Sequence, residues 1–166
     1  MGSAYKLELW SNIYLMLGGS AAGLIGLLFI VTSLHLVKIT NNSLLRRRAN
    51  QRTIYLFLLL IEAVIVLMPQ PMQALGVELI AINLFGLGFP FSNICSYWHK
   101  HKNPDKSDDW AIMRAIRYIV AFLVGTAGGV VLIRQSLWGM YLVTATYVAL
   151  FILVALNAWA NMFIRD

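Results

Sequence analysis

The sequence predicts an all-α fold, a polytopic transmembrane helical bundle, and three observations predict it. Hydrophobic residues make up 60% of the 166 residues, and charged residues only 12%. The mean hydropathy of +0.73 lies well above the range of soluble domains. Five stretches are long and apolar enough to cross a hydrocarbon core of roughly 30 Å as helices. We therefore expect a single transmembrane domain over residues 1–166 and no soluble domain.

The predicted spans lie near residues 9–37, 53–69, 72–97, 113–134 and 137–163. Trp10 and Tyr14 are typical interfacial anchors at the start of the first span. The second span is the shortest, bounded by Arg52 and Pro69. Short connections at residues 69–71 and 135–136 predict antiparallel hairpins between spans two and three and between spans four and five.

The distribution of basic residues predicts the orientation. Of the 13 Lys and Arg residues, 11 fall on one side: Lys38, Arg46, Arg47, Arg48, Arg52, Lys100, Lys102, Lys106, Arg114, Arg117 and Arg165. Loops rich in Lys and Arg stay in the cytoplasm. We expect an N-terminus outside and a C-terminus in the cytoplasm, with anionic lipid at Arg46, Arg47 and Arg48. The net charge of +6 then needs no nucleic acid as a partner.

Small residues recur at four-residue spacing in two spans. Gly19 and Gly23 form a GxxxG pattern that Gly26 extends, and Gly125 and Gly129 repeat the spacing in span four. Such spacing lets helix backbones approach closely in lipid. These glycines predict close-packing faces, either within one chain or between subunits.

Two carboxylates, Glu62 and Glu78, interrupt otherwise apolar spans, each eight residues from Gln70 in the Pro-Gln-Pro turn. A hairpin would place both about 12 Å below the turn. Ionisable residues inside a membrane usually mark a function, and a facing pair would share a proton or hold a cation. Arg134 is the candidate counter-ion. The alternatives are a structural Glu–Arg lock, or two neutral acids bonded to backbone carbonyls.

Further polar residues could line a path from these carboxylates toward the cytoplasm: His35, Asn83, Asn93, Thr144, Asn157 and Asn161, with Thr146 and Tyr147 beside them. Asn and Thr in spans also serve as hydrogen-bonding contacts between helices, which is the alternative interpretation.

Gly86, Gly88 and Pro90 predict a break or kink in span three, because proline removes a backbone hydrogen bond. A gate is one interpretation of such a break, and a static packing kink is the other.

We expect no enzymatic activity, cofactor or metal site. The sequence offers no Ser-His, Cys-His or metal-ligand constellation: Cys95 is the single cysteine, and His99 and His101 have poor zinc-ligand spacing.

Residues 18–29 and 67–71, followed by Ala74-Leu75-Gly76-Val77-Glu78, resemble a widespread family of small bacterial multi-pass membrane proteins. The resemblance covers about the first 80 residues. It implies a location in the bacterial inner membrane and no particular activity.

Two functions fit these observations. The first is a homo-oligomeric cation or proton pathway, a channel or small transporter that uses Glu62 and Glu78. The second is a non-conducting regulatory or scaffolding subunit that docks the transmembrane helices of a partner membrane protein on its small-residue faces.

Overall fold

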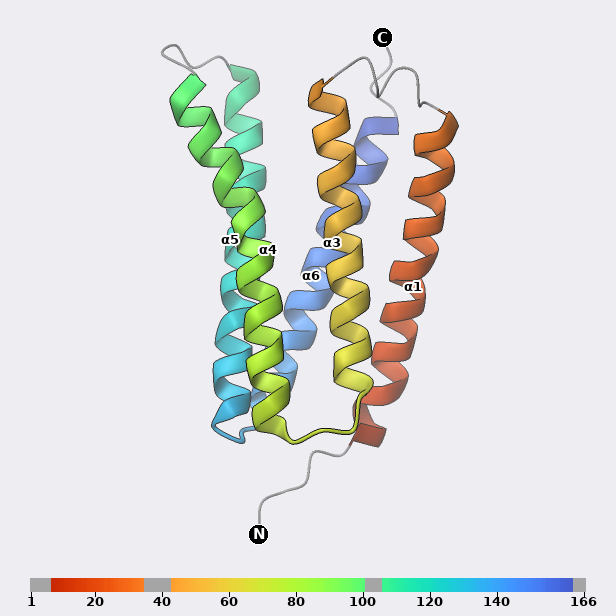
Figure 1. The fold of residues 1–166 in the computed structure, drawn as a ribbon, viewed down its shortest axis with the longest axis vertical. Helices are drawn as coiled ribbons and strands as arrows, with labels where there is room; N and C mark the ends of the chain where they lie inside the picture. The colour runs from red at the N-terminus through yellow and green to blue at the C-terminus, as the bar shows by residue number, and fades with distance from the viewer. Residues whose placement is uncertain (1–6, 35–42, 101–105, 163–166) are drawn as a thin grey trace. The chain divides into compact units, whose positions relative to one another are not determined.

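The computed structural model describes residues 7–34, 43–100 and 106–162, and all regular structure in these ranges is helical. Its helices are α1 (Leu7–Leu34), α3 (Ser43–Leu67), α4 (Met72–Lys100), α5 (Lys106–Ile133) and α6 (Trp138–Met162) (Figure 1). Each is long and apolar enough to span a membrane. The predicted fold class is confirmed, and the chain is a multi-pass membrane protein.

The apolar spans agree closely with the predicted ones. They run over Trp10–Leu34, Asn50–Leu67, Met72–Ser92, Ile112–Ile133 and Trp138–Asn157. Three helices continue past their spans into polar sequence: α3 begins at Ser43, α4 ends at Lys100 and α5 begins at Lys106. If each span crosses the membrane in turn, these three extensions are expected on one side of it, as the basic loops predict. Which side is cytoplasmic remains a prediction from the positive charges.

The chain divides into two compact units, each described here by itself. One comprises the described residues between 70 and 150, and so holds α4, α5 and the first part of α6. The other comprises the described residues up to 69 and those from 151 onward, and holds α1, α3 and the last part of α6.

In the second unit, α1 packs antiparallel on α3, and the contact centres on Gly18. A Cβ added at Gly18 would lie 3.0 Å from the Ala63 Cβ, so the two helices touch closely at this point. Tyr14 and Ala21 flank Gly18 on the buried side of α1. This spacing of i, i+4 and i+7 is one face of a helix.

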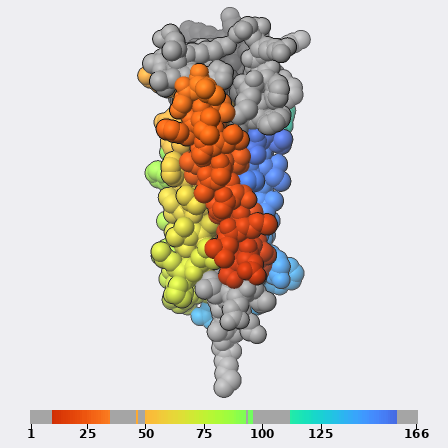
Figure 2. Space-filling view, turned by 90° about the vertical axis from the view of Figure 1, so that its right-hand side faces the viewer, coloured from red at the N-terminus to blue at the C-terminus, as the bar shows by residue number. Residues whose placement is uncertain are grey.

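The predicted ridge of α1 lies on a different face from Gly18. Gly19, Gly23 and Gly26 are exposed, and a Cβ added at any of them would meet no atom within 4 Å. Figure 2 looks onto α1 and shows its surface uncovered along the helix. These glycines therefore pack against no other residue in the part of the chain that the structure describes.

In the first unit, α4 and α5 form an antiparallel hairpin around Gly76 and Gly129. A Cβ on Gly76 would lie 2.7 Å from the Gly129 carbonyl oxygen, and one on Gly129 would lie 2.9 Å from the Gly76 oxygen. The backbones touch directly, as the small-residue spacing in α5 predicts.

The neighbouring glycine of α5 makes an equivalent contact with α6. A Cβ on Gly139 would lie 2.8 Å from the Gly128 carbonyl oxygen. Consecutive residues of a helix point about 100° apart, so Gly128 and Gly129 hold two different helices at one level. The buried stripe of α6 continues from there through Met140, Val143 and Tyr147.

The turn between α5 and α6 ends α5 in a Schellman motif. Gln135 has a φ of 59°, its N–H donates to the Leu132 oxygen at 2.8 Å, and the Ser136 N–H donates to the Val131 oxygen at 3.3 Å. Glycine usually occupies this left-handed position because a Cβ is strained there.

We expect Gly76→Ala to destabilise the protein by about 1–3 kcal/mol, because the added methyl group overlaps the α5 backbone. Thermal unfolding in detergent measures the change. Gly88→Ala is the matched control in the same helix, since Gly88 faces open space and its substitution should leave stability unchanged or higher. Equal losses in both variants would contradict the close contact.

Gln135→Gly should stabilise the protein by about 1 kcal/mol, because glycine adopts a positive φ without strain. The measurement is the unfolding midpoint in detergent, with Ser136→Gly as the control at the next position. A lower midpoint for Gln135→Gly would show that the Gln135 side chain contributes more than its backbone conformation costs.

Candidate functional site

Glu62 lies on the buried face of α3. Leu59, Ala63 and Val66 share this face, and the Glu62 side chain is only 2% exposed. Its Oε1 has no hydrogen-bond partner in the part of the chain that the structure describes. A buried carboxyl oxygen without a partner is costly in a membrane span, which makes Glu62 a candidate functional residue.

Glu78 is held differently, by a hydrogen bond to the preceding turn. The Gln70 Nε2 donates to Glu78 Oε2 at 2.8 Å, and both side chains are half-buried. Gln70 stands between Pro69 and Pro71, which restrict the turn and have no N–H of their own. The turn therefore fixes the amide that binds this carboxylate.

The two carboxylates belong to different units of the chain. Glu62 is five residues before the end of α3, and Glu78 is six residues after the start of α4. Each therefore lies at a depth of about 8–9 Å along its own helix from the turn. A shared site for the pair remains a prediction.

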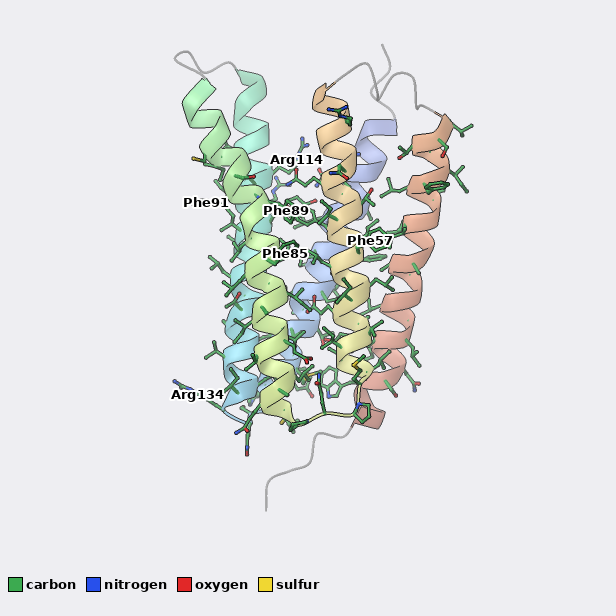
Figure 3. The ribbon with its side chains drawn as sticks, in the orientation of Figure 1. Phe57, Phe85, Phe89, Phe91, Arg114 and Arg134 are labelled. Carbon is green, nitrogen blue, oxygen red and sulfur yellow. The ribbon has the colours of Figure 1, made fainter. Side chains whose placement is uncertain are left out.

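Arg134, the predicted counter-ion, follows the last residue of α5 and is exposed. Figure 3 shows its side chain extending away from the helix. Its backbone N–H donates to the Val130 oxygen at 3.4 Å. Among the described side chains, Glu78 is bound by Gln70 rather than by this guanidinium group.

Three residues of the predicted polar path donate a hydrogen bond to their own helices. Each of three side chains donates to the carbonyl four residues earlier at 2.8 Å: Asn83 to Leu79, Thr144 to Met140 and Asn157 to Leu153. Asn83 is the most deeply buried of the three, at 1% exposure. His35 and the side chains of Asn93 and Asn161 lie outside the described residues.

The proline segment of α4 is a kink in a continuous helix. Pro90 sits inside α4 (Met72–Lys100), which changes direction in its C-terminal half (Figure 1). A Cβ on Gly86 would overlap the Phe122 ring, whereas Gly88 faces open space. Phe85 and Phe89 meet edge to face at 5.4 Å (Figure 3). Gly86 thus serves packing against α5, and a gating role for the segment stays a prediction.

Sequence reasoning missed two of the contacting glycines, Gly76 and Gly139, because each stands alone without a small-residue repeat around it. Of their partners, the sequence predicts Gly129 as a close-packing residue by its spacing from Gly125, whereas Gly128 is only part of the same glycine-rich stretch. The contacts pair an isolated glycine on one helix with the repeat on another.

No protein-family model matches this chain, and no curated protein or solved structure is significantly similar to it. The geometry of the described residues is therefore the basis for the functional proposal.

The hydrogen bond from Gln70 to Glu78 should contribute about 1 kcal/mol to stability, because it is charge-assisted but only half-buried. We expect Gln70→Leu to lower the unfolding midpoint in detergent. Gln73→Leu is the matched control, since Gln73 is exposed on the first turn of α4. Equal midpoints for the two variants would show that the bond contributes nothing.

Proposed function

We propose that this membrane protein conducts protons and that Glu62 is the group that binds the proton in transit. The observation that carries the proposal is the burial of Glu62 within a membrane span, with its Oε1 lacking a hydrogen-bond partner. Intramembrane carboxyl groups of this kind recur in proton relays. A carboxyl group fixed only for packing would normally be paired.

The surroundings of Glu62 favour a proton over a metal cation. A proton needs one carboxyl oxygen, whereas a bound cation needs several oxygen ligands around it. Within one turn of Glu62, the other buried residues of α3 are apolar: Leu58, Leu59, Ala63 and Val66. Over this stretch, the buried face of α3 supplies one acidic group and no further oxygen from a side chain.

Glu78 is the proposed group at the water-facing end of the path. It is half-buried, and its hydrogen bond to Gln70 ties it to the turn that joins α3 and α4. A carboxylate held there by an amide can exchange protons with water while keeping a fixed position. Arg134 would keep its predicted role as a counter-ion, a positive charge near that end of the path.

A homo-oligomer is part of the proposal, because five helices alone enclose a hydrated path poorly. The exposed glycines of α1, Gly19, Gly23 and Gly26, offer a face on which a second copy could pack closely. The proposed location, the bacterial inner membrane, is one across which proton gradients are maintained.

The exposed face of α1 equally favours a second candidate function, a regulatory or scaffolding subunit that docks the helices of a partner membrane protein. In that function Glu62 is a sealed packing group. A measurement of proton flux distinguishes the two functions, because only the first requires the protein to conduct protons.

We expect Glu62→Gln to abolish proton flux into proteoliposomes, because glutamine keeps the shape of the side chain but cannot bind and release a proton. The measurement is the decay of an imposed pH gradient, reported by an enclosed dye, at several membrane potentials. Glu78→Gln should slow the flux without abolishing it, since Glu78 serves at the end of the path.

The control is Gln73→Glu, which makes the reverse exchange at an exposed position of α4 and should leave the flux unchanged. If the native protein carries no flux at any pH or potential, or if Glu62→Gln conducts as well as the native protein, the proposed function fails. A Gly23→Leu variant that releases a co-purifying membrane protein would then favour the scaffolding function.

A further inference from the structure

Three helices of one unit bring polar groups together at mid-membrane depth. Asn83 of α4 and Thr146 of α6 flank Gly125 of α5, and their side chains are 1% and 2% exposed. Each of the three residues lies near the middle of its span. Gly125 is buried as well.

The missing side chain of Gly125 makes this meeting possible. A Cβ added there would collide with the Asn83 Oδ1 and would lie 3.0 Å from the Thr146 Cγ2. The side chains of Asn83 and Thr146 therefore approach the same point on α5 from opposite helices. Any larger residue at position 125 would push them apart.

Two oxygen atoms at this junction have no hydrogen-bond partner within the described residues. The Asn83 Nδ2 donates to the Leu79 oxygen at 2.8 Å, but its Oδ1 is unpaired, and so is the Thr146 Oγ1. Thr144, two residues away on the same helix, donates to the Met140 oxygen. Thr146 thus differs from its neighbour in lacking the usual bond to its own helix.

From these contacts we infer that Asn83 and Thr146 bind a water molecule between α4 and α6. The Asn83 Oδ1 can only accept a hydrogen bond, whereas the Thr146 hydroxyl can donate or accept. The Thr146 methyl group lies toward Gly125, and the hydroxyl group makes no direct hydrogen bond to the Asn83 oxygen. Water is the small molecule that can donate to both oxygens and bridge them.

The water site depends only on the geometry of Asn83 and Thr146. A role for it as a relay station in proton movement rests on the proposed function. Ordered water at mid-membrane depth would carry a proton between groups too far apart for a direct transfer. Its neutral ligands would hold the water without trapping the charge.

Substitution of Thr146 by valine distinguishes a water site from an unpaired hydroxyl group, because valine has nearly the same shape but no oxygen. If water is bound, Thr146→Val loses its hydrogen bond and should lower Tm by about 2–4 °C in detergent. If the hydroxyl group is merely buried without a partner, the same variant should raise Tm, and this result would overturn the inference. The control is Val148→Thr, which makes the reverse exchange at an exposed position of α6. It measures how much a Val/Thr exchange changes Tm away from the junction.

A direct hydrogen bond between Asn83 and Thr146 would also be lost in Thr146→Val, so a second measurement is needed. Brief X-ray irradiation generates hydroxyl radicals from bound water and oxidises nearby side chains. Phe122 is buried one turn from Gly125 on α5, and its ring packs at Gly86, one turn from Asn83. We therefore expect oxidation of Phe122 in the native protein and loss of this oxidation in an Asn83→Leu, Thr146→Val double variant. An unoxidised Phe122 in the native protein would overturn the water site.

Proton flux in the same variants separates this inference from the proposed function. Flux that is lost in Glu62→Gln but retained in the double variant would leave the proposed function standing and remove the relay role. Oxidation of Phe122 in a protein without flux would support the water site and refute the proposed function.

Discussion

Direct contact between glycine backbones is the constraint on which the unit of α4, α5 and the first part of α6 depends. In lipid, no hydrophobic effect drives apolar side chains onto another helix. Close approach of the backbones therefore supplies much of the attraction between helices. Gly129 touches Gly76 of α4, and Gly128 touches Gly139 of α6. One turn further along α5, and two turns further along α4 and α6, the same three helices bring Asn83, Gly125 and Thr146 together. Without the glycine contacts the polar junction would have no fixed geometry.

The sequence predicts the number, order and limits of the spans well, because length and apolar composition alone decide whether a helix can cross a bilayer. It predicts helix faces poorly. Gly19 and Gly23 have the ideal spacing, yet Gly18 makes the contact with Ala63. In water an amphipathic pattern would mark the packed face, but in lipid both faces of α1 are apolar.

The candidate site was predictable in part for the same reason. A carboxylate in an apolar run is rare enough to be recognised, so Glu62 and Glu78 stood out, and Gln70 stood out with them. The partners of the polar residues were harder to predict, because an Asn or Thr can bond to another helix or to the carbonyl one turn earlier. In Asn83, Thr144 and Asn157 the nearer acceptor is used. A long side chain such as Arg134 has still more freedom.

Hydrogen bonds to acceptors within the same helix affect how each helix is inserted into the membrane during biosynthesis. Ser20, Thr126 and Thr144 donate their hydroxyl hydrogens to carbonyls of their own helices. These three hydroxyl groups enter the bilayer already bonded to their own helices. By contrast, α3 has the shortest of the candidate spans and carries Glu62, whose buried Oε1 has no such bond among the described residues. During biosynthesis, insertion together with a neighbouring helix would therefore stabilise α3 in the membrane more than insertion alone.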